Sequence, residues 1–184
     1  MNMADPIQKG QLLIAMPELA DPNFLQTVIL LCNYGTEGAL GVILNRPTGI
    51  AVSALIHDFP PPAGVNLIYE GGPIAKNSVL VLCRGEGNEG NENDIIEDIF
   101  LAQDIASLKK DDAPYSDIRF YLGYAGWTSG QLEAEIQSGA WRTAIADPTL
   151  IFDIDPSLLW PKMMRSLGPA CAFYATMPLN PSMN

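Results

Sequence analysis

The chain has 184 residues, 48% of them hydrophobic, which predicts a folded protein with a sizeable core rather than a disordered chain. Its 10 basic and 21 acidic residues give a formal net charge of −11, which argues against direct binding of DNA or RNA because lysine and arginine supply most of that affinity. No apolar run approaches the ~18 residues of a membrane span, and residues 1–10 lack the pattern of a signal peptide, so neither secretion nor a membrane partner is expected.

The first part of the chain predicts three strands. Residues 10–16 form an apolar run that Pro17 ends, and residues 27–32 form a second run. Residues 39–44 follow after a turn at 34–38, whose glycines favour a hairpin between the second and third strands.

The middle of the chain predicts one helix and two further strands. Apolar residues recur at the spacing of one helix face over 50–59, and residues 65–69 and 79–83 are strand-like. Residues 85–94 predict an acidic surface loop rich in glycine and asparagine. Residues 95–108 mix strand and helix signals, and the pattern does not decide between them.

The last part predicts two strands and two helices. Residues 118–124 and 150–154 are strand-like. Residues 129–140 have helical spacing, with Ser129 as a candidate cap, and residues 158–167 predict a second helix that a Gly-Pro pair ends. Because the early strands follow one another without helices between them, we expect an α+β fold with a largely antiparallel or mixed sheet, curved or barrel-like.

The three cysteines, Cys32, Cys83 and Cys171, form no CxxC pair. Cys32 and Cys83 each end a strand-like run and are expected to be buried, reduced thiols that pack as small hydrophobic side chains, with a metal or catalytic role as the alternative. Reduced thiols fit a cytoplasmic location.

Motifs of the common enzyme classes are missing from the sequence. It has neither a GxxxxGK[ST] phosphate loop nor a GxSxG nucleophile motif, and residues 85–90 match GxGxxG only inside the acidic loop, whose carboxylates would repel phosphates. His57 is the only histidine and is expected to be a solvated or half-buried residue of the helix over 50–59. We therefore predict no catalytic residue, no metal and no cofactor.

Two segments, residues 38–47 and residues 123–133, carry the most specific patterns. In the first, Asn45 and Arg46 follow an apolar strand and precede Pro47, which restricts the backbone. Asn45 offers donors and an acceptor, and Arg46 offers a fork for carboxylate or phosphate. Either these groups bind a ligand or partner, or Asn45 satisfies loop backbone while Arg46 pairs with a local acid.

In the second segment, Trp127 either packs in the core or forms an aromatic wall of a pocket, and Gly126 permits close approach of the backbone. Glu133 is either solvated, part of a helix cap, or at the mouth of the pocket. We predict that both segments converge on one cleft with the turn that joins the two middle strands. The predicted ligand- or partner-binding residues are Asn45, Arg46, Gly71, Gly72, Gly126, Trp127 and Glu133.

Taken in order with residues 10–17, 27–31 and 71–73, the two segments resemble the YqgE/AlgH family of bacterial proteins, over about residues 8–175. The resemblance implies that residues 1–184 form one domain, with a barrel-like sheet flanked by helices, in the bacterial cytoplasm. Typical members have a histidine in the hairpin turn after the second strand, where this chain has Asn33-Tyr34. That departure argues further against catalysis by histidine.

The resemblance supplies no settled activity, although some members are described as regulators of transcription through a link to alginate synthesis. We expect a non-enzymatic regulatory protein that binds a small anionic ligand or a protein partner and does not contact DNA directly. The alternative is an enzyme of unknown reaction that uses Arg46, Asn45 and Glu133 without histidine or metal. A third possibility, a role in assembly, would be marked by a large apolar surface patch.

Overall fold

The computed structural model describes residues 6–56, 67–85, 92–102, 104, 105, 108 and 115–177. The strands are β1 (Gln11–Ala15), β2 (Val28–Gly35), β3 (Gly38–Ile43), β4 (Pro47–Ala51), β5 (Leu67–Glu70), β6 (Ile74–Arg84), β7 (Asp94–Ile96), β8 (Ile99–Leu101), β9 (Asp117–Thr128) and β10 (Trp141–Ile145). The helices are η1 (Pro22–Phe24), α1 (Val52–Leu55), α2 (Gln131–Gln137), α3 (Pro148–Phe152), α4 (Pro156–Ser166), α5 (Pro169–Ala172) and η3 (Tyr174–Thr176).

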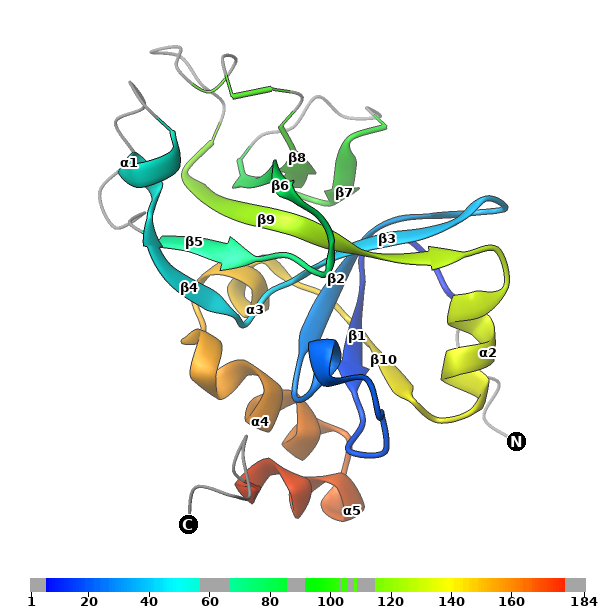
Figure 1. The fold of residues 1–184 in the computed structure, drawn as a ribbon. Coiled ribbons are helices and arrows are strands. Elements are labelled where there is room, and N and C mark those ends of the chain that lie inside the picture. The colour runs from blue at the N-terminus through cyan, green and yellow to red at the C-terminus, as the bar shows by residue number, and fades with distance from the viewer. Residues whose placement is uncertain are drawn as a thin grey trace.

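The strands form one curved sheet with the order β10-β1-β2-β3-β9-β6-β8-β7, and β5 joins it by pairing with both β9 and β4 (Figure 1). Among the pairs of described strands, only that of β5 with β9 is parallel. The predicted α+β fold with a curved, mostly antiparallel sheet is confirmed.

Strand β9 organises the sheet because it has neighbours along both edges. Along one edge, residues 120–122 pair with β5 and residues 125–128 pair with β3. Along the other edge, β6 pairs with residues 117–124. The two segments singled out in the sequence, 38–47 and 123–133, are therefore direct neighbours through β3 and β9.

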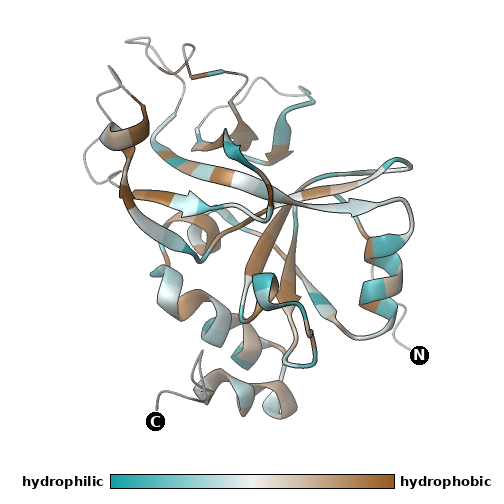
Figure 2. Cartoon of the chain, in the orientation of Figure 1, coloured by the Kyte–Doolittle hydropathy of each residue, from teal (hydrophilic) through white to brown (hydrophobic). Residues whose placement is uncertain are grey.

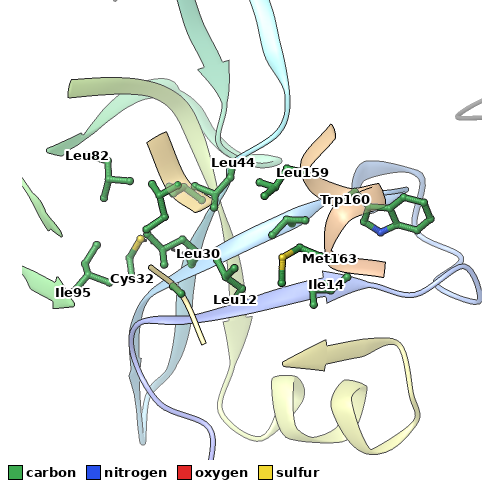
Figure 3. Packing of buried hydrophobic residues seen from close by; sticks show 14 of the residues in the cluster. Leu12, Ile14, Leu30, Cys32, Leu44, Leu82, Ile95, Leu159, Trp160 and Met163 are labelled. Atoms are coloured by element: carbon green, nitrogen blue, oxygen red, sulfur yellow. Dashed lines mark hydrogen bonds between the residues drawn. The ribbon is translucent and has the colours of Figure 1, made fainter. Parts of the chain in front are cut away.

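The main hydrophobic core lies between one face of the sheet and helix α4 (Figure 3). Alternate residues of β1 and β2 point toward α4, which contributes Leu159, Trp160 and Met163 (Figure 3). The indole of Trp160 also donates to the carbonyl oxygen of Ala15 at 2.8 Å, so its one polar atom is satisfied inside the core. In Figure 2, strands β1 and β2 are mostly hydrophobic, whereas helix α2 is largely hydrophilic.

Helices α3 and α4 begin at capping aspartates, and two arginines hold α3 against the sheet. Asp155 accepts from the N–H of Ser157 at the start of α4, and Pro156 occupies the first turn. Arg84 of β6 and Arg119 of β9 donate to carbonyl oxygens of α3, and both guanidinium groups stack on the ring of Phe152. Arg119 is nearly buried, yet its donors have these partners.

Most predicted strands are confirmed, and the differences have local causes. The predicted strand over 150–154 is wrong: most of it belongs to α3, because Asp147 caps the N–H of Leu150 and Pro148 starts a helical turn. Residues 50 and 51 lie in strand β4 rather than in a helix, and α1 covers residues 52–55 of the helix predicted over 50–59. His57 and residues 86–91 of the predicted acidic loop lie outside the described residues.

Four further features were not predicted. Residues 95–108 contain β8 and part of β7, two short strands. Strand β10 pairs with β1 at the edge of the sheet, and helix α5 follows α4. Helix α2 has Gly130, not Ser129, at its N-cap position, and no side chain caps it there.

Candidate functional site

A shallow, open groove of about 400 Å³ lies where β3 and β9 pair. One wall comes from the end of the β2–β3 hairpin, and the opposite wall comes from the first residue of β6. The residues that line the groove are Asn33, Glu37, Gly38, Ala39, Leu40, Ile74, Tyr124, Gly126, Trp127 and Thr128. Glu37 is the one ionisable carboxylate among them, and the remaining lining is backbone, amide, hydroxyl and hydrophobic surface.

Two of the residues that line this groove, Gly38 and Gly126, are glycines in close contact with their neighbours. Gly126 lies opposite Leu40 in the β3–β9 pair, and a Cβ added to it would meet Cδ1 of Ile74 at 2.8 Å. Gly38 lies opposite Thr128, and a Cβ there would lie 2.1 Å from the carbonyl oxygen of Trp127. The backbone of β9 thus leaves no room for a side chain at Gly38, whereas the side chains of Ile74 and Tyr124 cover Gly126.

Trp127 lines the groove but is 6% exposed, and most of its ring belongs to a second hydrophobic cluster. Its ring stacks with Phe24 and meets the edge of Trp141, with ring centroids 6.5 and 6.0 Å apart. Both indole N–H groups donate to the same carboxylate oxygen of Glu135, at 2.9 and 2.8 Å. Core packing is therefore the main structural role of Trp127, and α2 is tied to β9 and β10 through Glu135.

Asn45 and Arg46 make contacts within the fold. The side-chain amide of Asn45 accepts from the N–H of Val28 and donates to the carbonyl oxygen of Gln26, both at 2.9 Å. Arg46 donates to the carbonyl oxygens of Asn23 and Leu25 and lies 3.9 Å from a carboxylate oxygen of Glu70. These contacts correspond to the structural interpretation of the Asn-Arg-Pro sequence, and burial lowers the pKa of Arg46 against the opposing effect of Glu70.

Gly71 and Gly72 lie where the chain crosses β9 between β5 and β6. The N–H of Gly71 donates to the carbonyl oxygen of Leu122, and its own carbonyl oxygen accepts from Ile43. A Cβ on Gly72 would lie 2.2 Å from the carbonyl carbon of Tyr124. Both glycines are buried, and neither is among the groove residues.

Glu133 is exposed on α2 and accepts a hydrogen bond from the hydroxyl of Tyr34 at the end of β2. This bond lowers the pKa of Glu133 and raises that of Tyr34, because it favours the carboxylate and the protonated phenol together. Of the seven predicted site residues, Gly126 and Trp127 line the groove, while Asn45, Arg46 and Glu133 are engaged in the contacts given above.

A family model described as AlgH-like matches residues 12–172 of the chain. The chain belongs to the AlgH-like family. A UPF0301 protein of Chlorobium chlorochromatii is 36% identical over 100% of this chain and 99% of its own length. A UPF0301 protein of Streptomyces coelicolor is also 36% identical, over 95% of this chain and 94% of its own.

Two solved structures show the same AlgH-like fold. The solution structure of the AlgH protein from Pseudomonas aeruginosa has a TM-score of 0.73 and 32% identity, over 97% of this chain and 98% of that one. The crystal structure of a Corynebacterium diphtheriae protein has a TM-score of 0.78 and 24% identity, over 95% of this chain and 94% of that one. Neither name states a ligand or a reaction.

At the β2–β3 hairpin, this AlgH-like chain has Asn33 in the groove wall and Tyr34 bonded to Glu133. The sequence pattern did not single out Asn33, Glu37 or Tyr124 as site residues. The pairing of the segments 38–47 and 123–133 places all three at one groove, and such pairing is a tertiary contact. In the sequence, the glycines that bound the β2–β3 turn were the one signal that could have indicated this hairpin as part of a site.

All three cysteines lie in the described part of the chain, and none is in a disulfide. Cys32 and Cys83 are buried and free, as predicted, and burial raises the pKa of each to about 12. Cys171 is free and half-buried.

Among the described residues, no three histidine, cysteine, aspartate or glutamate side chains are grouped to hold a metal ion. None of the helices in that part of the chain has the length and apolar composition needed to cross a membrane.

Proposed function

We propose that the protein is a non-enzymatic regulatory protein of the cytoplasm that binds a protein partner, and that the groove between the hairpin and β9 receives a short segment of that partner. The character of the groove carries this proposal. It is shallow and open, and its lining combines hydrophobic side chains with amide and hydroxyl groups. Such a surface suits a peptide more than a small molecule, which usually occupies an enclosed pocket with converging polar groups.

The charge of the groove favours a protein partner over a small anion. Glu37 would repel a phosphate or carboxylate in the groove, while Arg46, the cation first considered for an anion, donates to two backbone carbonyls. The net charge of −11 adds to this preference and supports regulation through a partner instead of direct contact with DNA.

The contacts of the candidate residues weigh against the enzymatic alternative. It requires Asn45, Arg46 and Glu133 to act together on a substrate. Asn45 is bonded to the backbone of β2 and its preceding loop, and Glu133 accepts from Tyr34 with a lowered pKa, which suits neither a general acid nor a base poised near neutral pH.

The test is a selection of random peptides displayed on phage against the folded protein, followed by mapping of an enriched synthetic peptide by NMR chemical-shift changes. Thr128→Trp places an indole over the groove from an exposed position and should abolish enrichment. Ile145→Trp is the matched control, because Ile145 is 82% exposed on β10, four strands away from β9 in the sheet.

The proposal requires shift changes concentrated at residues 38–40 and 124–128 and loss of enrichment only with Thr128→Trp. It fails if no peptide is enriched above background, or if the enriched peptides shift a different surface and bind both tryptophan variants equally. A nucleotide or sugar phosphate that raises the melting temperature of the wild type but not of Arg46→Ala would support a small anionic ligand in place of a protein partner.

A further inference from the structure

The groove is one face of the sheet at a place where four strands lie side by side. Asn33 of β2 lies opposite Leu40 of β3, and Leu40 lies opposite Gly126 of β9. Ile74 of β6 lies opposite Tyr124, which is two residues before Gly126 on β9. Because directly paired residues point to the same face of a sheet, as do alternate residues of one strand, these five positions share the groove face.

The part of this face around Gly126 is hydrophobic. The end of the Ile74 side chain and the ring of Tyr124 lie 2.8 and 3.4 Å from the position that a Cβ on Gly126 would take. Leu40 adjoins Gly126 from the neighbouring strand, and both Leu40 and Tyr124 are half-buried. Ile74 remains 40% exposed. A hydrophobic side chain placed on Ile74, Leu40 and Tyr124 would therefore remove apolar surface of all three from water.

The hairpin end of the groove is polar and carries a negative charge. Glu37 adjoins Gly38, which lies opposite Thr128, and Thr128 is roughly 7 Å along β9 from Gly126. Within the part of the chain that the structure describes, no hydrogen bond or ion pair engages the side chains of Asn33 or Glu37. Both side chains are exposed, so their oxygen atoms are available to donors from another molecule.

We propose, on the basis of the function proposed above, that the partner segment binds through a hydrophobic side chain on Ile74, Leu40 and Tyr124 and through a lysine or arginine that pairs with Glu37. The distance from Gly126 to Thr128 corresponds to two residues of an extended chain, whose alternate side chains face the same way. The long stem of lysine or arginine covers the remaining distance to Glu37. Charge complementarity selects a cation at this end, so the partner is a protein segment with a hydrophobic and a basic residue two positions apart.

The charge pairing is tested by the peptide selection on the wild type and on Glu37→Lys. Glu18→Lys is the matched control, because Glu18 is an exposed acid outside the groove. Wild type and Glu18→Lys should enrich peptides with a hydrophobic residue two positions from a lysine or arginine. Glu37→Lys should bind the wild-type peptide about tenfold more weakly, and a peptide with glutamate at the basic position should restore its binding. Groove-binding peptides without such a pair of residues would overturn the inference.

The hydrophobic contact is tested by truncating the peptide, which leaves the folding of the protein unchanged. Alanine at the hydrophobic position should weaken binding to the wild type about tenfold and binding to Ile74→Ala much less, because that variant has already lost much of the contact. Ile145→Ala, at an exposed isoleucine of β10, is the matched control and should show the full loss.

Equal losses on the wild type and Ile74→Ala would overturn the hydrophobic contact, and failure of the charge-swapped peptide to restore binding would overturn the pairing with Glu37. Either result would leave groove binding intact, whereas a wild type that enriches no peptide would refute the proposed function itself.

Discussion

The indole N–H of Trp127 on β9 donates to the carboxylate of Glu135 on α2, and the indole N–H of Trp141 donates to the same carboxylate. One carboxylate oxygen thus serves two nearly buried donors, and Gln131 donates to the other oxygen. The position of Trp127 in the groove lining and the packing of α2 depend on the same carboxylate. A change at Glu135 therefore affects the site through the fold.

Replacing Glu135 by alanine is expected to lower the free energy of unfolding by about 2–4 kcal/mol, because two buried indole N–H groups lose their acceptor. Glu135→Gln keeps an acceptor oxygen and should recover about half of the loss. Urea unfolding followed by tryptophan fluorescence measures both. Equal stability of Glu135→Ala and the wild type would show that the two indoles find other partners.

Gly72→Ala is expected to destabilise the fold by about 3 kcal/mol or more, since the added Cβ overlaps the backbone of Tyr124 where the chain crosses β9. Gly35→Ala is the matched control, because a Cβ at Gly35 has no atom within 4 Å. Thermal unfolding of the two variants gives the comparison. Equal melting temperatures of Gly72→Ala and Gly35→Ala would show that the backbone at the crossing shifts to accommodate the added Cβ.

Arg46→Ala is expected to lower the free energy of unfolding by about 1–2 kcal/mol, because the carbonyls of Asn23 and Leu25 lose a donor and η1 is held less firmly against β4 and β5. Peptide binding at the groove should be unchanged. Chemical denaturation and binding of the selected peptide test the two statements separately. Loss of peptide binding at full stability would place Arg46 in the binding site.

The hydrogen bond from Tyr34 should make the titration of Glu133 differ between the wild type and Tyr34→Phe. The carboxyl pKa of Glu133 is lowered in the folded protein, so the bond contributes stability above the pKa of the unfolded chain and loses it as the pH falls through the folded value. In Tyr34→Phe the pKa should rise toward its ordinary value. NMR titration of the Glu133 side chain reports this, and an unchanged pKa would contradict the bond.

The thiols should differ in reactivity. Burial raises the pKa of Cys32 and Cys83 to about 12, so neither is a thiolate near neutral pH, and reagents cannot reach them in the folded state. Cys171 is half-buried and should react first. Alkylation at pH 7.5 followed by mass spectrometry should find label at Cys171 alone, with Cys32 and Cys83 labelled only in denaturant. Label at Cys83 in the native protein would show that β6 opens.

Strands with continuous apolar runs could be predicted from the sequence because burial on both faces leaves a strong local signal, as in β1 and β2. Strand β10 gives no such signal: it lies at the sheet edge and alternates buried Trp141 with exposed Arg142. Residues 150–154 resemble a strand in composition, yet the Asp147 cap and Pro148 favour a helix that begins just before them. The spacing of apolar residues alone does not reveal where a capping residue starts a helix.

The candidate site was only partly predictable for a related reason. Gly126 and Trp127 were singled out as individual residues, and the structure places both in the groove. Asn45 and Arg46 have the chemistry of a binding site, but which carbonyls they meet depends on the loop at residues 21–27, distant in sequence. Glu37 became a candidate only once β3 was seen to pair with β9, since that pairing places the turn of the β2–β3 hairpin at the groove.

The pairing of β1 with β10 joins residues 11–15 to residues 141–145, far apart in the sequence. A chain synthesised from its N-terminus therefore presents the hydrophobic strand β1 long before its edge partner exists, and loop closure over this separation is slow compared with local contacts. During that interval the nascent sheet has an exposed edge at β1. Trp141, fully buried when β10 docks, marks the step at which this edge is covered.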